Sequence, residues 1–361
     1  LTGTEANALD LPRNDQGTAL IGDPRNDENI VIAQLHLMFL RFHNAVITDV
    51  EAGAFDGFRL ATDKDDFEFA RRIVRWHYQW IVKEEFLPAV IQPGVLSSME
   101  SDMNQGGWCK TGDLPDLPIE FSAAAYRFGH SQVRGSLRLR RGQAPVPLFD
   151  RSGGLVGFHP IDPGDTIDWS LFFRTTLAHP QPARKLDTFL ARELFDLPFA
   201  PIGPDASLAS RNLRRGATTF QLSTGEEAHA FLNSHTGGSM GDPLPLHPAV
   251  TAAQLTGTPL WFYCLYEAEV GAGKLGKVGG TLVGLTLLRM LHQDPLSYLA
   301  DTTRDKVQAY EARARIYGMK EHLPARSFRA ASQRSWTPFL GPNKTFSMAD
   351  MIRYVESSEG R

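Results

Sequence analysis

Apolar residues recur at helical spacing along much of this 361-residue chain. The first such run lies in the stretch "NIVIAQLHLMFLRFHNAV" (29–46), where apolar side chains stand three or four positions apart. It predicts a helix over about 28–50, with Asp27 available as its cap. A second run predicts a long helix over 64–92 that breaks near Pro88, because proline lacks the N–H that a helix interior uses.

Between these patterns the chain shows loop chemistry. The stretch 136–168 is rich in glycine and proline with short β-like runs, and it predicts a loop with at most a hairpin. Further helices are predicted at 119–135, 168–178, 183–194, 224–235, 248–253, 258–268, 278–293, 297–312 and 347–356. No internal repeat is present. The pattern therefore predicts a mainly α fold with few short strands, in a single domain over 1–361.

Composition narrows the classes of protein. There are 37 basic and 41 acidic residues, a net charge of −4, which argues against a nucleic-acid surface. The basic run from Arg134 to Arg141 is typical of a solvated face. No apolar run is long enough to span a bilayer; the best, 278–291, is interrupted by glycines and Arg289. The first residues show no signal-peptide pattern, so we expect a soluble protein, secreted or cytoplasmic.

One short stretch, "AAAYRFGHSQV" (123–133), combines small residues with a single imidazole, His130. A core histidine satisfied by a backbone carbonyl is one interpretation. The other is an axial ligand to haem iron through Nε2. Ala124, Ala125 and Gly129 would then allow a flat macrocycle to approach the backbone. The local residues leave both interpretations open.

Four stretches together decide between them. They are "GDPRNDEN" (22–29), "AYRFGHS" (125–131), "LASRNLRRG" (208–216) and the apolar segment 258–288. In this order and at these spacings they resemble the animal-type haem peroxidases of the peroxidase–cyclooxygenase superfamily, and more narrowly its bacterial members. The resemblance covers nearly the whole chain and implies the mainly helical fold of that family, with haem b as cofactor.

The resemblance assigns a proximal site. It implies that His130 is the proximal ligand of the haem iron and that Asn212, 82 residues later, holds its Nδ1. Arg127 and Arg215 match family arginines that contact the haem propionates, which suits a guanidinium because it grips carboxylates in a fork. Without the family, Asn212 would be interpreted as a turn residue and each arginine as a surface residue.

The resemblance also assigns the distal side. Arg25 matches the family's distal arginine, whose charge stabilises the oxygen that leaves when a peroxide is cleaved. The alternative is a loop arginine paired with Asp23 or Asp27. Glu28 matches a glutamate that forms an ester with a haem methyl carbon in some relatives, although a glutamate at a helix start is also favoured by the helix dipole. Asn29 stands where certain relatives carry a methionine, so no sulfonium link is expected.

The distal base is absent from these residues. The family supplies it from a Gln-x-x-Asp-His-Asp type of motif, and no Asp-His pair occurs here. The calcium-binding loop that follows that motif is absent as well, so calcium stays possible only outside these residues. We expect either a smaller partner polypeptide that carries the distal histidine, a shortened gene product, or a divergent member that binds haem without turnover.

The predicted function is reduction of hydrogen peroxide with oxidation of a halide or a small organic donor. A fatty-acid dioxygenase of the same superfamily is the alternative enzyme, with Tyr126 as its radical carrier; Tyr126 lies four residues before His130, whereas those oxygenases place the tyrosine three before. A catalytically silent haem-fold interaction module is the third possibility. His36, His43 and His77 are expected to be structural.

Overall fold

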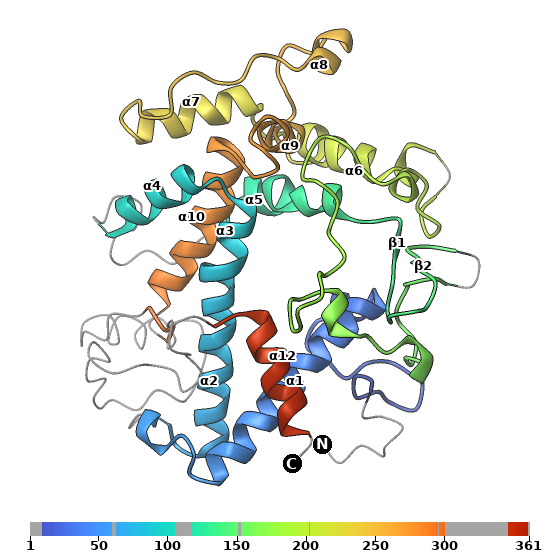
Figure 1. Cartoon of the computed structure of the whole chain (residues 1–361). Coiled ribbons are helices and arrows are strands. Elements are labelled where there is room, and N and C mark those ends of the chain that lie inside the picture. The colour runs from blue at the N-terminus through green and yellow to red at the C-terminus, as the bar shows by residue number, and fades with distance from the viewer. Residues whose placement is uncertain are drawn as a thin grey trace. The chain divides into compact units, whose positions relative to one another are not determined.

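The computed structural model describes residues 9–59, 63–104, 117–150, 153–201, 203–294, 296–299 and 346–359. Its contacts divide the chain into two compact units. Unit 1 contains residues 1–81, 135–182 and 301–361, and unit 2 contains residues 82–134 and 183–300. Helices dominate both units in Figure 1, and the described residues contain one short pair of strands. The prediction of a mainly α fold is confirmed, whereas that of one domain over 1–361 stays a prediction.

Unit 1 is organised around three helices. α1 (Ile30–Glu51) packs against α2 (Asp66–Trp80) and against α12 (Met348–Ser358), which lies beside it in Figure 1. Their apolar faces form one core, whose fully buried members include Phe42, Val46, Phe69, Ile73, Met351 and Ile352. The helices predicted at 28–50 and 347–356 are confirmed. The cap of α1 is Asn29, whose side chain accepts from Val31 N, and not Asp27, which lies in the preceding 3₁₀ turn η2 (Pro24–Asp27).

The predicted helix over 64–92 forms, but it does not break at Pro88. After α2 the chain widens into a π-helical turn, η4 (Ile81–Phe86), and continues as α3 (Leu87–Val90). Proline removes one i→i−4 hydrogen bond and its ring crowds the preceding turn. A wider turn just before the ring relieves that crowding, so the helix continues to Val90.

The segment predicted as loop and hairpin contains the two strands. β1 (Ser136–Leu137) and β2 (Val146–Pro147) pair antiparallel, with Ser136 opposite Pro147. The helix predicted at 168–178 is wrong: only a 3₁₀ turn, η7 (Trp169–Leu171), forms there. Trp169 inserts into the core of unit 1, and this packing outweighs the local helical pattern. Short 3₁₀ turns η3 (Asp56–Phe58) and η6 (Pro163–Asp165) complete the unit.

Unit 2 is built around α10 (Lys277–Gln293), which contacts α4 (Pro93–Asn104), α5 (Ile119–Ala123), α7 (Gly225–His235) and α9 (Leu260–Val270). Its core includes the fully buried residues Leu87, Ile91, Cys264, Leu265, Val278, Val283 and Leu288. Glycines let α10 approach its neighbours: a Cβ on Gly284 would lie 2.4 Å from the terminal methyl carbon of Met99.

Most helical predictions in unit 2 are confirmed, including α7, α8 (Pro248–Ala252), α9 and α10. The helix at 183–194 is wrong, since only η8 (Arg192–Phe195) forms in that region. α4 was not predicted. The predicted helix 119–135 is split into α5 and the 3₁₀ segment η5 (Ala125–Gln132). The remaining elements are η9 (Pro204–Ala206), α6 (Leu208–Arg214) and the π-helical η10 (Arg215–Thr219).

Most of the helix predicted at 297–312 lies outside the described residues. Among those residues, α1 alone has the length and mean hydropathy of a membrane span, with 39% of that stretch buried inside the structure. By length and composition, the expectation that no apolar run is long enough to span a bilayer, with 278–291 as the best, is therefore wrong. Core helices reach the same hydropathy, and α1 packs against α2 and α12.

Candidate active site

His130 lies in η5, the 3₁₀ segment that follows a break in the helix at Ala124 (φ −133°, ψ −75°). The ring is half-buried. On the neighbouring helix α9, Trp261 Nε1 donates to the carbonyl oxygen of Arg127 at 3.2 Å and so anchors η5. A Cβ on Gly129 would meet nothing within 4 Å, so open space lies beside the backbone there. Ala124 and Ala125 are buried in the core of unit 2.

Asn212 is the partner of this histidine. Its amide Nδ2 lies 2.8 Å from His130 Nδ1, although the two residues are 82 positions apart. Asn212 is fully buried on α6, a helix that Ser207 caps by accepting from Ser210 N. The pairing that the family resemblance implied is therefore present in the structure. A hydrogen bond at Nδ1 fixes the ring's orientation, so that Nε2 is the atom left to meet a ligand.

Arg215 touches the same amide from its other side. It stands three residues after Asn212, one helical turn along the same face, and its Nη1 donates to Asn212 Oδ1 at 3.0 Å. The imidazole, the amide and the guanidinium thus form one chain of hydrogen bonds. Arg214, the adjacent residue, is exposed and pairs with Asp205 at 2.7 Å.

Arg127 and Arg215 place two guanidinium groups near His130. Arg127 Nε donates to the carbonyl oxygen of Ser122 at 3.0 Å, and among the described residues neither arginine forms an ion pair with a carboxylate. Burial lowers the pKa of Arg127, and the charge of Arg215 lowers it further. Burial lowers the pKa of His130 to about 4, with smaller contributions from the two arginines. Two uncompensated cations beside a neutral imidazole favour a dianionic ligand.

Arg25 and Glu28 lie in unit 1. The side chain of Arg25 is 78% exposed and forms an ion pair with Asp23, two residues earlier in η2. This pairing keeps the pKa of the Asp23 carboxyl at about 2. Glu28 is exposed as well, and its carbonyl oxygen accepts from Gly157 N at 2.9 Å. The structure thus contains the surface pairing that was the alternative for Arg25.

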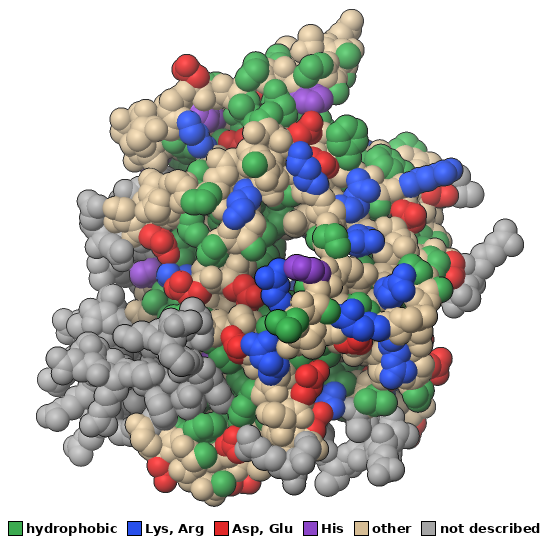
Figure 2. Space-filling view, in the orientation of Figure 1, with side chains coloured by type: hydrophobic (Ala, Val, Ile, Leu, Met, Phe, Trp, Pro, Cys, Tyr) green, Lys and Arg blue, Asp and Glu red, His purple; other side chains and the backbone are tan. Residues whose placement is uncertain are grey.

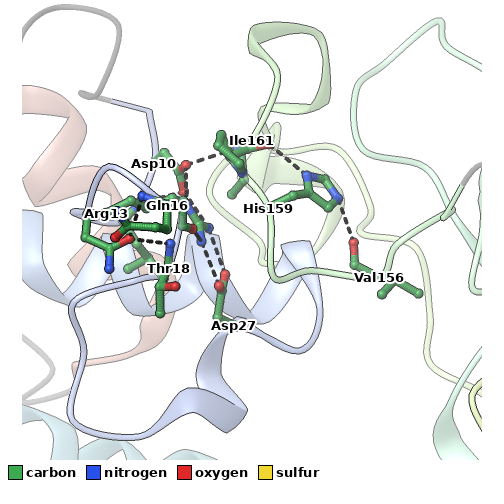
Figure 3. Close-up of polar contacts among 12 residues, drawn as sticks. Asp10, Arg13, Gln16, Thr18, Asp27, Val156, His159 and Ile161 are labelled. Atoms are coloured by element: carbon green, nitrogen blue, oxygen red, sulfur yellow. Dashed lines mark hydrogen bonds and ion pairs between the residues drawn. The ribbon is translucent and has the colours of Figure 1, made fainter.

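A buried ionic cluster supports the turn that carries Arg25. Arg13 contacts Asp27 through two hydrogen bonds of 2.7 and 2.8 Å and also Asp10 at 2.8 Å (Figure 3). Asp10 in turn accepts from Ile161 N at 3.1 Å. All three charged side chains are less than a tenth exposed. The sequence pattern misses this cluster, because it predicts that Asp27 is a helix cap. The only signal of the cluster in the sequence is the Asp-Pro-Arg turn (23–25) that precedes Asp27.

His77, His36 and the basic run from Arg134 to Arg141 have contacts typical of structural residues. His77 is fully buried, and its Nδ1 lies 2.6 Å from the carbonyl oxygen of Ile73. The described residues contain no group of three or more His, Cys, Asp or Glu side chains that could hold a metal ion. His36 Nδ1 faces the amide of Asn26 at 3.3 Å. On the face seen in Figure 2, acidic side chains stand among the basic ones. Within the basic run, Arg141 pairs with Asp168 at 3.4 Å, in keeping with a solvated face.

The fold and this site define a mainly helical protein in which an amide orients an imidazole. Beside the imidazole stand two guanidiniums that have no carboxylate partner among the described residues. Comparison with known proteins identifies the family. Residues 3–216 match the model of the animal haem peroxidase family, and the chain belongs to that family. Membership implies that the protein binds haem.

Individual relatives agree with the family. Chorion peroxidase of Drosophila melanogaster is 26% identical over 299 residues, covering 78% of this chain and 34% of the relative. A peroxidase-like protein of Margaritifera margaritifera is 34% identical over 208 residues, covering 54% and 26%. The chain therefore spans about a third or less of these relatives. Peroxidase A from Dictyostelium discoideum shares the fold, with a TM-score of 0.56 at 18% identity over 82% of this chain and 57% of that one.

Proposed function

We propose that this chain is the haem-binding part of a peroxidase that reduces hydrogen peroxide and oxidises a halide or a small organic donor. The observation that carries the proposal is the hydrogen bond between Asn212 and His130 beside two arginines without carboxylate partners. An imidazole with one nitrogen held and the other without a described partner suits a metal ligand. Two guanidiniums without a described carboxylate partner suit the two propionates of haem b.

The chain's own residues have distinct parts in this proposal. His130 would hold the iron through Nε2, Asn212 would fix the ring, and Arg127 and Arg215 would seat the propionates. Bound haem supplies the redox chemistry that cleaves the peroxide O–O bond. Half-burial and the two nearby cations keep His130 neutral, as a ligand nitrogen must be.

Arg25 is proposed as the distal arginine, the cation that stabilises the departing oxygen. In the structure its guanidinium is held by Asp23, so this role requires Arg25 to leave that carboxylate. The buried contacts of Arg13 with Asp27 would keep the turn in place while the exposed arginine changes partner. The ester between Glu28 and a haem methyl carbon is proposed on the family motif alone.

The proton shuttle is proposed to come from a histidine outside this sequence, on a smaller polypeptide that also supplies any calcium loop. A distal base must take a proton from the incoming peroxide and return it to the leaving oxygen. The absence of an Asp-His pair from the sequence supports this assignment. Native mass spectrometry of the purified protein tests it: the proposal expects the 40.0 kDa chain together with one haem and a second polypeptide.

A haem titration tests the haem site, and an oxidation assay tests the activity. Haem added to the wild-type chain should give a histidine-ligated absorption spectrum, which His130→Ala loses and His235→Ala, an exposed histidine on α7, retains. Peroxide-dependent oxidation of guaiacol should then follow haem content when the partner polypeptide is present. Full haem binding by His130→Ala contradicts the assigned ligand, and inactivity of the complete haem complex supports the silent module.

The dioxygenase alternative rests on Tyr126, and its surroundings do not favour it. Tyr126 is 45% exposed and its ring stacks on Phe121, with 4.5 Å between centroids. It lies four residues before His130, not three. Electron paramagnetic resonance after peroxide addition discriminates between the two enzymes: a tyrosyl radical that Tyr126→Phe abolishes, together with oxygen uptake on a fatty acid, supports the dioxygenase.

A further inference from the structure

The hydrogen bonds around Asn212 determine which way its amide faces. A guanidinium has only N–H donors, so the atom that Arg215 Nη1 contacts at 3.0 Å is the carbonyl oxygen of the amide. The amide NH₂ is therefore turned toward His130 Nδ1, 2.8 Å away. The amide oxygen and nitrogen can be assigned from this contact, because in the reversed orientation the amide NH₂ would face the N–H groups of the guanidinium.

This orientation determines where His130 carries its proton. Nδ1 must present a lone pair to the amide NH₂, since an N–H at that position would face another donor. The proton of the neutral ring is consequently on Nε2. A metal ion needs the lone pair of Nε2, so the ring as held here is in the tautomer that does not bind iron.

The ligating arrangement requires the opposite amide orientation. Turning the amide by half a revolution brings Asn212 Oδ1 to face an N–H at Nδ1, which leaves a lone pair on Nε2. The imidazole gives its Nε2 proton to solvent and takes one at Nδ1, so its charge does not change. The same rotation points the amide NH₂ at Arg215, and two donor groups cannot stay in contact. Arg215 must therefore release the amide.

We infer that Arg215 and Asn212 form a latch on the proximal histidine, which opens when a carboxylate of the incoming cofactor takes Arg215 away from the amide. The inference rests on the proposed haem function and adds a second role for Arg215, that of a positioning residue acting through Asn212. A carboxylate shifts the equilibrium toward the open state when it takes the place of Asn212 Oδ1 as the acceptor of the Arg215 Nη1 hydrogen bond. A cofactor without free carboxylates would find the latch closed.

Arg127 provides the matched control. It is also a half-buried arginine without a described carboxylate partner, but its Nε donates to the carbonyl oxygen of Ser122 and not to Asn212. The latch therefore gives different predictions for the two arginines. Both should bind a propionate, whereas Arg215 alone should oppose ligation when no propionate is available.

The first test compares haem with haem dimethyl ester, whose propionates are uncharged. Arg215→Met and Arg127→Met should each weaken binding of haem. For the dimethyl ester, Arg215→Met should bind about tenfold more tightly than wild type, the equivalent of one charge-assisted hydrogen bond, and Arg127→Met should match wild type. Equal ester affinities for wild type and Arg215→Met would overturn the latch and leave Arg215 as a propionate contact only.

The second test needs no haem and uses a variant only to assign the signals. The ring ¹⁵N chemical shifts of His130 in the cofactor-free chain, assigned with His130→Gln, report its tautomer. The latch expects a proton on Nε2, and a proton on Nδ1 would overturn it even if haem ligation by His130 is established. Absence of His130-dependent ligation by haem refutes the proposed function instead, so the two failures are separable.

Discussion

Glu267 on α9 accepts the backbone N–H of Val278 through both of its carboxylate oxygens, each at 3.0 Å, in the first turn of α10. The same carboxylate accepts from Gly279 N at 2.9 Å. It is 5% exposed, and burial raises its pKa to about 7 although these N–H groups act in the opposite direction. A side chain of one core helix thus supplies the cap of the next.

This cap makes stability depend on pH. The folded pKa of Glu267 lies above that of the unfolded chain, so the protonated form is favoured by folding. The contribution is present below about pH 4.5 and is lost as the pH rises through 7. Glu267→Gln should therefore gain stability relative to wild type between pH 5 and 8, by at most about 3 kcal/mol.

Urea unfolding at a series of pH values measures this difference. Glu227, an exposed capping-box residue of α7, is the matched control, because hydrogen bonds from Thr224 lower its pKa. Its contribution has the opposite sign and is lost as the pH falls. A stability difference between Glu267→Gln and wild type that stays constant with pH contradicts the prediction.

His77 should limit stability in acid. Burial lowers its pKa to about 4, below the unfolded value of 6.5, so the neutral ring's contribution is complete above pH 6.5 and is lost as the pH falls toward 4. His77→Phe keeps an aromatic ring against Phe42 and Phe346. The variant should lose less unfolding free energy than wild type between pH 7 and 4.5. His235→Phe, at an exposed position, should follow wild type.

The Arg13 cluster should contribute far more to the free energy of unfolding than the surface pair of Asp23 and Arg25. Arg13→Met leaves Asp10 and Asp27 buried without their cation and should lower the free energy of unfolding by about 3–5 kcal/mol. Asp23→Asn removes the partner of the exposed Arg25 and should leave the free energy of unfolding nearly unchanged, because solvent screens an exposed ion pair. Chemical denaturation of both variants checks the contrast, which comparable losses would contradict.

Asn212 should control haem affinity. Removing the hydrogen-bond partner of a ligating histidine typically costs about 10–100-fold in metal affinity, and we expect this of Asn212→Ala. Asn212→Asp should retain affinity, because a carboxylate accepts from Nδ1–H in any orientation. Arg214→Ala, one residue before Arg215 and exposed, is the control and should bind haem as wild type does. Unchanged haem titrations for Asn212→Ala would contradict the assignment.

The helices that sequence predicted are those determined by local chemistry. The apolar stripe of α1 and the capping box of α7, formed by Thr224 and Glu227, are local patterns that lead to the same helix in most surroundings. Prediction from local patterns failed where tertiary packing determines the backbone conformation. At 168–178 the pattern is helical, but burial of Trp169 in the core holds the chain in a 3₁₀ turn.

By itself, the sequence determined the helical character and the family motifs, because each is encoded in short runs of residues. Those motifs made His130, Asn212, Arg127 and Arg215 the candidate site residues. Only the tertiary structure decided their contacts. A hydrogen bond across 82 residues depends on how α6 meets η5, and the two buried bonds of Arg13 to Asp27 depend on an irregular loop. The direction of the Asn212 amide is likewise a property of its neighbours, since the residue type allows both orientations and Arg215 selects one.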